Sequence, residues 1–584
     1  MRRLLILYGS QSGTAQEVAE RVGREGRRIH YVTDVKAMDE YDVRQLPTEE
    51  RVVFVASTTG QGDEPDNMKS FWKFLLRKNL PGDSLKSLQF GVLALGDSSY
   101  QKYNYVGKKL YRRLLQLGGT SCQPLGLCDE QHDLGHDFVI DPWLGALWNI
   151  LLRMDPLPPG LDIVDSTVLP PSKYIVDMNT KKQGDEILET NPIFNKENPY
   201  YASVTKCERV TSENHFQDTR LIELNIDNSG IVTRPGDVCN VQPENSEENV
   251  DFFFRIFPQF ERTNNISLRQ NPETNIKLPS ERQYGTLLTI EDYVRKYLDI
   301  QGIPRRYFFE LLSHFTKDEL EKEKFREFNS AGGQQDLYEY CNRPRRNILE
   351  TLYDFQLHTV PNIPFDYLFD LIPPIKPRSF SIASPGSDSK IEILVAVVRY
   401  KSSLVEPRKG LCSTWLSRLT PLNDEIPIWI TSGTFKFPNE SIPKIMVGPG
   451  TGIAPFRSYL LSNSSSPLPV ALFFGCRGES KDYYFEKDWA YLKKCKDFSF
   501  HVAFSRDTES KVYVQHLIKK EKERVKDIIL EKNGFFFIAG NAKQMPDQVR
   551  DALKYVLDEC GVEDPEEYVK TMELKNRFQT ETWS

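Results

Sequence analysis

The sequence predicts a multidomain α/β plus β protein: two domains with parallel sheets, and between them an antiparallel barrel domain that carries a helical insert. Three observations lead to this fold class. The length of 584 residues suffices for three or four domains with buried cores. Short apolar strands alternate with amphipathic helices near both ends of the chain, which is typical of parallel sheets. In the middle, alternating strands with Pro-Gly turns are typical of antiparallel sheets.

The elements follow in that order. The first α/β domain is expected over residues 1–154, with buried strands at Leu4–Tyr8, Arg51–Ser57 and Phe90–Leu95. Residues 155–198 are rich in proline and then polar, which predicts a partly stiff linker. The antiparallel domain is expected over 199–436, with a helical insert at about 290–356. The second α/β domain is expected over 437–584, with strands at Ile445–Val447, Val470–Phe474, Phe500–Phe504 and Phe535–Ala539.

Composition excludes several classes of protein. The formal net charge is -7 and hydrophobic residues make up 39% of the chain, so neither a nucleic-acid-coating polycation nor a disordered polyelectrolyte fits. No apolar run approaches the roughly 20 residues that span a bilayer, and the N-terminus is apolar too briefly for a signal peptide. The nine cysteines form no CxxC pair, which argues against structural zinc or a bound iron–sulfur centre. We therefore expect a cytosolic protein with reduced cysteines.

The first predicted strand runs into a loop of glycines and hydroxyl residues that opens a helix near Gln16. Such a loop forms a phosphate cradle, because backbone N–H groups and hydroxyls converge at a helix N-terminus. It lacks the Gly-Lys-Ser/Thr ending of a nucleoside-triphosphatase loop and the Gly-x-Gly-x-x-Gly of a dinucleotide loop. A monophosphate is the better fit, and an ordinary turn is the alternative. The candidate residues are Ser10, Gln11, Ser12, Gly13, Thr14 and Ala15.

Two further loops leave the carboxyl ends of predicted strands and would open onto the same crevice. Two tyrosines of the later loop could sandwich a planar heterocycle, although packing in the core is the alternative. The three loops together resemble flavodoxin, and that resemblance implies an FMN site that Asp129 or Glu130 closes. Thr59 departs from the aromatic residue that related reductases often carry. The candidates are Ser57, Thr58, Thr59, Gly60, Leu95, Gly96, Asp97, Ser98, Ser99, Tyr100, Gln101, Lys102, Tyr103 and Asn104.

The middle domain contains a segment that resembles the Arg-x-Tyr/Phe-Ser signature of the ferredoxin–NADP reductase family: Arg378, Ser379, Phe380 and Ser381. The arginine offers a bidentate cation for a pyrophosphate, and the serine hydroxyl could reach a flavin ring nitrogen. A second segment resembles the family's turn that opens a helix at the FAD pyrophosphate: Gly410, Leu411, Cys412 and Ser413. Arg345 could add another cation, or it could belong to a solvated basic patch.

The last domain carries a glycine-rich turn between a strand and a helix, Gly448-Pro449-Gly450-Thr451-Gly452. This turn permits close approach to a dinucleotide pyrophosphate, and it resembles the NADP signature of the same reductases. Thr451 is the candidate ligand there. A downstream segment, with Asp547 further on, is similar to the family's 2′-phosphate and adenine pocket and predicts NADPH over NADH. Its candidates are Ser505, Arg506, Lys511, Val512, Tyr513, Val514 and Gln515.

The order of these segments resembles the diflavin reductase family over nearly the whole chain. That resemblance implies an enzyme that passes electrons from NADPH to FAD, then to FMN, and then to a one-electron acceptor. It also implies that Ser381, Glu581 and Trp583 surround the reacting flavin atom. Family members of the microsomal type carry a cysteine where this chain has Ala539, and we expect hydride transfer to survive without the thiol.

Within the family, the compact size and several motifs resemble the cytosolic branch. That resemblance implies that the acceptor is the iron–sulfur protein anamorsin (Dre2 in yeast), in cytosolic iron–sulfur cluster assembly. A haem protein or methionine synthase remains an alternative acceptor, and a scaffold that keeps its flavins is an alternative of another class. Acidic residues near the FMN loops predict a rim that steers a basic patch of the acceptor: Asp63, Glu64, Asp66, Asp129, Glu130, Asp133 and Asp137.

Overall fold

A computed structural model describes residues 2–59, 62–100, 102–178, 193–284, 288–330, 332–465, 467–495, 497–507 and 509–583. The chain folds into two compact units, and neither unit is one continuous stretch of sequence. Unit 1 comprises Met1–Glu186, Asn245–Lys376 and Lys401–Glu406. Unit 2 comprises Ile187–Glu244, Pro377–Tyr400 and Pro407–Ser584.

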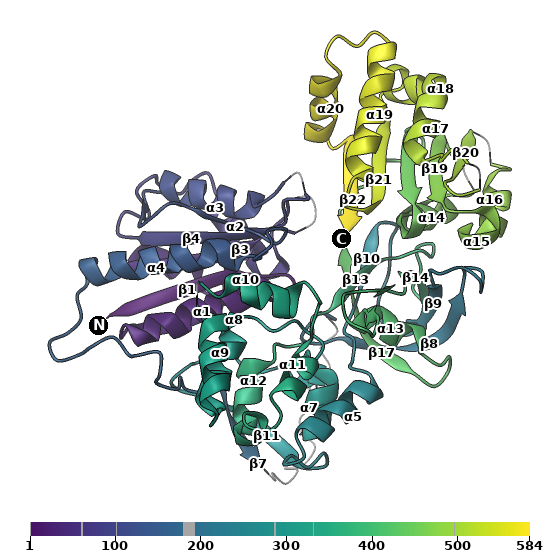
Figure 1. Ribbon diagram of the computed structural model, residues 1–584. Coiled ribbons are helices and arrows are strands. Elements are labelled where there is room, and N and C mark those ends of the chain that lie inside the picture. The colour runs from purple at the N-terminus through teal and green to yellow at the C-terminus, as the bar shows by residue number, and fades with distance from the viewer. Residues whose placement is uncertain are drawn as a thin grey trace. The chain divides into compact units, whose positions relative to one another are not determined.

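Unit 1 begins with a parallel α/β domain, here named the first sheet domain (residues 2–154; Figure 1). Its strand order is β2-β1-β3-β4-β5, and β6 also pairs with β4. The strands are β1 (Arg3–Gly9), β2 (Val32–Ala37), β3 (Arg51–Ser57), β4 (Gln89–Gly96), β5 (Thr120–Ser121) and β6 (Gly126–Asp129). Helices α1 (Thr14–Arg28) and α4 (Asp137–Met154) bury one face of the sheet. Helices α2 (Lys69–Leu75) and α3 (Tyr105–Gln116) bury the other.

The central strands of this sheet are apolar along their whole length because both faces are covered. In β1, Leu5 belongs to the core with α2 and α3 and its neighbour Ile6 to the core with α1 and α4, and both residues are fully buried. Strands β3 and β4 alternate between the two cores in the same way. A residue run that is buried on both faces shows no polar alternation. This is why the sequence predicted these strands to within a residue or two of their observed bounds.

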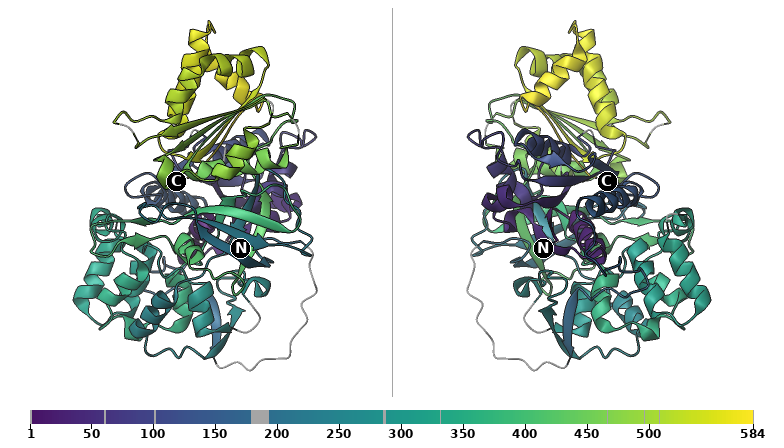
Figure 2. Two further views of the ribbon diagram at one scale, coloured as in Figure 1. Left: turned by 90° about the vertical axis from the view of Figure 1, so that its right-hand side faces the viewer. Right: turned by 90° about the vertical axis from the view of Figure 1, so that its left-hand side faces the viewer.

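The remainder of unit 1 is helical and is here named the helical region (residues 245–376; teal in Figures 1 and 2). The short helices gather around one core rich in phenylalanine and leucine. They are α5 (Glu247–Ile256), α6 (Glu281–Tyr284), α7 (Ile290–Lys296), α8 (Arg306–Phe315), α9 (Glu319–Asn329), α10 (Gln334–Leu337), α11 (Ile348–Asp354) and α12 (Leu368–Leu371). Helices α7 and α11 each begin with a capping box, at Thr289 and Asn347, which satisfies backbone donors at the helix start. The predicted insert of 290–356 covers the middle of this region.

A small three-stranded sheet joins the helical region to a strand of the predicted linker. Strand β7 (Tyr174–Met178) pairs with β11 (Asn265–Gln270), which also pairs with β12 (Leu288–Thr289). Residues of the predicted linker therefore form a strand, because Tyr174 and Val176 pack into the helical core. Residues 179–192 of that linker lie outside the described residues.

Unit 2 contains an antiparallel six-stranded sheet with the order β13-β10-β17-β8-β9-β14. Its edge strands meet at an isolated bridge between Ile382 and Ile393, which closes the sheet toward a barrel. Helix α13 (Leu411–Ser417) packs against the barrel core. The strands are β8 (Tyr200–Arg209), β9 (Thr219–Asn225), β10 (Asp237–Val241), β13 (Arg378–Ser381), β14 (Lys390–Ala396) and β17 (Glu425–Ser432), with a separate pair β15 (Arg399–Tyr400) and β16 (Arg408–Lys409).

The last part of unit 2 is a second parallel sheet, with the order β20-β19-β18-β21-β22. Its strands are β18 (Lys444–Pro449), β19 (Val470–Cys476), β20 (Phe498–Phe504), β21 (Phe535–Asn541) and β22 (Phe578–Trp583). Helices α14 (Ala454–Ser462) and α16 (Glu486–Leu492) contribute to one core, and the short helix α15 (Glu479–Asp482) precedes α16. The opposite core is built by α17 (Val514–Lys520), α18 (Lys522–Lys526), α19 (Met545–Glu559) and α20 (Pro565–Leu574).

The observed sheets confirm the predicted fold class of parallel, antiparallel and parallel domains. In the described part of the chain, no helix is both long and apolar enough to cross a membrane.

Candidate functional site

The first candidate loop joins β1 to α1 and is held in shape by its own hydrogen bonds. The Ser10 N–H donates to Asn67 Oδ1 (2.8 Å), and the Gly13 N–H donates to Ser10 Oγ (3.0 Å). Gly13 has φ of 94°, which favours glycine because a Cβ is strained in the left-handed region. Helix α1 then begins at Thr14, so its first N–H groups are left to face a ligand. The loop fits an anion such as a phosphate.

The second and third loops follow β3 and β4, which are neighbours in the sheet. The Thr58 N–H donates to the Leu95 carbonyl (3.0 Å), so the two loop starts are tied together. Thr59 and Asp63 exchange a pair of backbone hydrogen bonds. Ser57 Oγ donates to the carbonyl of Gly9 at the end of β1 (3.2 Å). Two predicted residues, Gly60 and Gln101, lie outside the described residues.

The third loop contains a buried amide side chain. Asn104 is fully buried, and its Nδ2 donates to the Cys128 carbonyl (3.1 Å). Its Oδ1 is buried with no hydrogen-bond partner in the described part of the chain. An unpaired buried acceptor is costly, so this atom points to a ligand with a hydrogen-bond donor.

Tyr103 and Asp129 border the same loop. The Tyr103 hydroxyl donates to the Leu127 carbonyl (3.1 Å), and burial raises the pKa of Tyr103 to about 12. Burial alone would raise the pKa of Asp129, but hydrogen bonds from Ser98 and Gln131 outweigh it and hold that pKa below its ordinary value. Asp129 therefore fixes the loop as a carboxylate. Tyr100 is partly buried, while Ser98, Ser99, Lys102 and Glu130 are exposed.

The predicted flavin segment of unit 2 lies on the edge strand β13, which pairs with β10. Arg378 and Ser379 are exposed, whereas Phe380 and Ser381 are partly buried. Ser379 Oγ donates to Asn240 Oδ1 on β10 (2.7 Å). Asn240 was not expected from the sequence, because its role depends on strand pairing between distant segments.

Helix α13 supplies the second segment of this site. Burial raises the pKa of the Cys412 thiol to about 12, so it stays a neutral core group. Ser413 Oγ accepts a hydrogen bond from the Val398 N–H (3.0 Å) and fixes the start of the helix. Thr414 Oγ1 is buried without a partner among the described residues, so a polar group of a ligand fits beside it. Arg345 belongs to unit 1, where it is exposed and has φ of 56°.

The glycine-rich turn after β18 allows very close backbone packing. A Cβ on Gly452 would lie 2.1 Å from the Ala539 carbonyl oxygen at the end of β21, so only glycine fits. Thr451 is partly buried in the turn. The carboxyl ends of β18 and β21 thus meet at the loop where a dinucleotide is expected.

The predicted 2′-phosphate segment leaves β20, whose neighbour is β19. The N–H groups of Ser505 and Arg506 donate to the carbonyls of Cys476 and Arg477, so this loop starts beside the end of β19. Several candidates are exposed, namely Arg506, Lys511, Tyr513 and Asp547. Two exposed cations with an exposed aromatic ring fit a phosphorylated ribose and an adenine.

Two of the three predicted catalytic positions, Glu581 and Trp583, lie on β22 of the second parallel sheet, and the third, Ser381, lies on β13 of the antiparallel sheet. Ser381 Oγ donates to Glu581 Oε1 (2.7 Å). Glu581 lies opposite Ala539 and Trp583 opposite Asn541 in the β21–β22 register. Glu581 Oε2 is buried without a partner in the described residues. Burial raises the pKa of Glu581, although hydrogen bonds from Ser381 and Thr434 oppose the rise.

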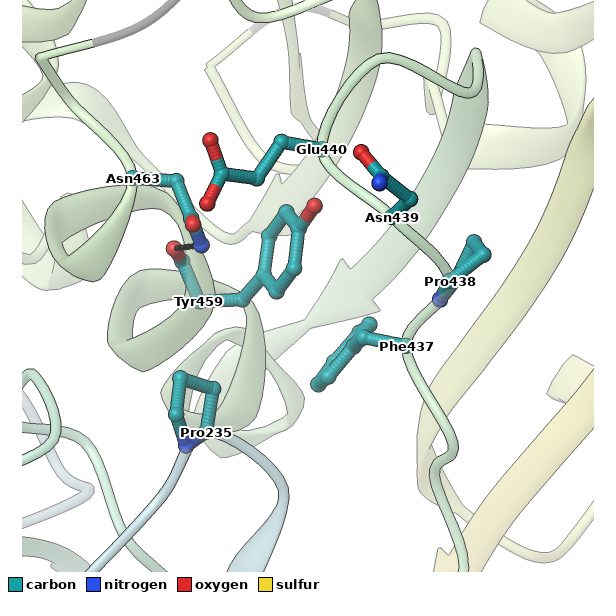
Figure 3. Close-up of a pocket in the computed structure, with 7 residues that line it drawn as sticks. All are labelled: Pro235, Phe437, Pro438, Asn439, Glu440, Tyr459 and Asn463. Carbon is teal, nitrogen blue, oxygen red and sulfur yellow. Dashed lines mark hydrogen bonds between the residues drawn. The ribbon is translucent and has the colours of Figure 1, made fainter.

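A cavity of about 390 Å³ lies at the other end of β18 from the glycine-rich turn (Figure 3). It contains none of the predicted residues. Its wall includes Tyr459 on α14, whose side chain is 4% exposed. Next to it, the Lys444 ammonium donates to the carbonyls of Asn439, Glu440 and Ile442, and burial lowers its pKa to about 8. The lining residues are Pro235, Phe437, Pro438, Asn439, Glu440, Tyr459 and Asn463.

Three models of protein families match successive parts of the chain. Residues 6–143 match the flavodoxin family, 192–415 match the FAD binding domain, and 446–551 match the oxidoreductase NAD-binding domain. NADPH-dependent diflavin oxidoreductase 1 of Xenopus laevis is 48% identical over 603 residues, covering 100% of both chains. The Bos taurus protein of that name is 45% identical over 605 residues, and the Arabidopsis thaliana protein 36% over 626, each covering 100% of this chain and 99% of the relative.

These comparisons confirm the predicted enzyme class and the predicted cofactors. Buried polar atoms of Asn104, Thr414 and Glu581 have no hydrogen-bond partner among the described residues, and cofactor contacts at these atoms stay a prediction. The chain belongs to the NADPH-dependent diflavin oxidoreductase family and is an oxidoreductase that binds FMN, FAD and NADPH.

Proposed function

We propose that this enzyme works in the cytoplasm and delivers single electrons from its FMN site to an iron–sulfur protein, anamorsin (Dre2 in yeast), for cytosolic iron–sulfur cluster assembly. When bound, FAD takes a hydride from NADPH and FMN passes the electrons on one at a time. The observation that carries the proposal of a protein acceptor is the set of exposed acids beside the FMN loops.

Ser381 and Glu581 would help to position the reacting groups for hydride transfer, through the hydrogen bond that joins their side chains. Because burial favours the neutral carboxyl, Glu581 can hold a proton on Oε2 while Oε1 accepts from Ser381. Ala539 is fully buried beside Glu581 in the sheet, so the site is shaped without a thiol. Orientation by these strands is sufficient for hydride transfer.

The acidic rim near the FMN loops is smaller than the sequence suggested. Glu64 pairs with Lys109 (2.5 Å), and Asp66 pairs with Lys69 (2.5 Å). Asp137 pairs with Arg21 (3.0 Å). Such pairs leave little net charge at the surface, so these three acids contribute less to steering.

Four acids of the rim are exposed, and three of them take no part in the ion pairs named above, namely Asp63, Glu130 and Asp133. They border loops that hold the FMN, which is the cofactor that donates to the acceptor. We infer that they attract a basic patch of the acceptor and raise its association rate. The effect should fall as salt screens the charges.

A stopped-flow experiment without oxygen tests this proposal. The NADPH-reduced enzyme is mixed with oxidised anamorsin, and bleaching of the cluster is followed at low and high ionic strength. The test variant carries Asp63→Asn, Glu130→Gln and Asp133→Asn. The control carries Glu50→Gln, Asp83→Asn and Asp162→Asn, which are exposed acids away from the FMN loops.

We expect the test variant to lower the second-order rate about tenfold at low salt and the control to change it little. If NADPH reduces the flavins of the native enzyme but the anamorsin cluster does not bleach, anamorsin is not the acceptor. A haem protein or methionine synthase would then be tested in the same way. Flavins that NADPH leaves oxidised would favour the scaffold alternative.

A further inference from the structure

Cationic side chains from outside the first sheet domain reach one face of α1. The contacted residues of α1 are three apart, so they share one side of the helix. The contacts are Lys376 Nζ to Thr14 Oγ1 (3.0 Å), Arg305 Nη1 to Glu17 Oε2 (2.7 Å) and Lys173 Nζ to Glu20 Oε2 (2.7 Å). All six residues belong to unit 1.

Lys376 differs from the other two cations in what it approaches. Arg305 and Lys173 meet carboxylates further along α1, whereas Lys376 meets the hydroxyl at the first residue of the helix. Its side chain also passes over Gly13, since a Cβ there would lie 4.0 Å from Lys376 Cε. Lys376 thus reaches the centre of the loop that fits a phosphate.

The chemistry of the contact leaves Thr14 able to bind an anion. A hydroxyl can accept one hydrogen bond and still donate its own proton. Thr14 Oγ1 accepts from the ammonium, so its proton can point to a phosphate oxygen. An ammonium beside that hydroxyl would strengthen the binding of a dianion.

The backbone before Lys376 is fixed to the helical region. The Ile375 N–H donates to the Tyr297 carbonyl (2.6 Å), and Ile375 is 3% exposed. Pro374 forms an isolated bridge with Leu298. The lysine therefore reaches the loop from an anchored support.

The electrostatic field at this helix start is positive. Burial raises the pKa of Glu17, but Arg305, Lys376 and Lys173 outweigh burial and hold that pKa below its ordinary value. The same field favours a phosphate, together with the helix dipole.

We propose that Lys376 of the helical region is a ligand of the FMN phosphate, which it holds together with the Thr14 hydroxyl. The helical region and the first sheet domain then share one anion. Binding of FMN favours their contact, and their contact strengthens FMN binding by the same factor. Riboflavin lacks the phosphate and gains nothing from Lys376.

The test uses the full chain with FAD retained and FMN removed. Dissociation constants of FMN and riboflavin are measured by flavin fluorescence for the native chain, Lys376→Ala and Lys376→Arg. Lys277→Ala is the matched control, because Lys277 pairs with Glu40 (2.6 Å) between the same two parts and is exposed. FAD content and riboflavin affinity report whether each variant is folded.

We expect Lys376→Ala to weaken FMN about tenfold or more and riboflavin less than about twofold. Lys376→Arg should recover most of the loss, and Lys277→Ala should leave the FMN-to-riboflavin ratio unchanged. The ratio in the native chain should also shrink as salt rises. The proposal is overturned if Lys376→Ala weakens FMN and riboflavin binding equally, or weakens neither. Comparing two chains with two flavins isolates the interaction between the lysine and the phosphate, because only FMN carries a phosphate.

Discussion

Replacing Arg457 by methionine should destabilise unit 2 strongly. Arg457 lies on α14 and is buried between the barrel and the second parallel sheet. Its Nη1 donates to Glu392 Oε2 (2.5 Å) and to the Ala383 carbonyl (2.9 Å), and its Nε donates to Asp488 Oδ2 (2.7 Å). One side chain therefore neutralises two carboxylates and satisfies a carbonyl.

The magnitude follows from the exposure of each partner. The side chains of Arg457 and Glu392 are 9% and 12% exposed, so removing the arginine leaves a buried carboxylate at a cost of about 3–5 kcal/mol. Asp488 is 29% exposed, and its pair adds only about 0–1 kcal/mol. We expect a total loss of roughly 3–5 kcal/mol, because the terms share one side chain and do not add fully.

Thermal unfolding followed by FAD release measures the loss in the full chain. At about 2–4 °C per kcal/mol for a domain of this size, the midpoint should fall by roughly 6–20 °C. The double variant Arg457→Met/Glu392→Leu should recover at least half of the fall, because it leaves no unpaired carboxylate at position 392. A single variant that shifts the midpoint by less than about 2 °C, or a double variant no better than the single, would refute this reasoning.

Two other predictions concern the nicotinamide side of the enzyme. Gly452→Ala should raise the KM for NADPH more than about tenfold, since its Cβ would overlap the Ala539 carbonyl. Gly145→Ala is the control, because Gly145 lies within helix α4 and its Cβ would meet nothing within 4 Å; equal kinetics of both variants would contradict the expectation. The pKa of Glu581 is raised in the folded chain. The folded chain therefore loses stability as pH rises above the ordinary carboxyl range, because a buried carboxyl must then ionise. Below that range the carboxyl is neutral in both the folded and the unfolded chain, so this cost is absent. Glu581→Gln should therefore gain thermal stability over the native chain as pH rises from about 4 to 8 while flavin reduction by NADPH slows; a stability difference that is constant with pH would count against it.

The buried strands of both parallel sheets could be predicted because their apolar runs are continuous. Arg51–Ser57 was expected and observed with the same bounds. The edge strand β2 (Val32–Ala37) was missed because half of its residues are polar, as suits a strand at the sheet edge. Helix α5 (Glu247–Ile256) was missed because three consecutive phenylalanines obscure the three-residue spacing of its buried Val250, Phe253 and Ile256.

The loops of the candidate site could be predicted because their chemistry lies within short segments. Ser10 and Ser381 stand in motifs that a reader can recognise without a fold. Asn67 and Lys376 could not be predicted, because only tertiary structure brings them to the first loop. One feature of the sequence could have drawn attention to Lys376: it stands two residues before Arg378, which begins the predicted flavin segment.

The helical region interrupts the barrel at a point where two strands are partners. Strands β10 and β13 pair antiparallel, with Val241 opposite Arg378, and the helical region separates them in sequence. With that region cut out and its ends joined, the two strands would form an ordinary hairpin. In the intact chain the two strands are instead far apart in sequence. The entropic cost of bringing them together grows with the length of chain between them. If the helical region folds early, its first and last residues come close together. The two strands that flank it in sequence, β10 and β13, are then held near each other, which favours their pairing at the edge of the barrel sheet.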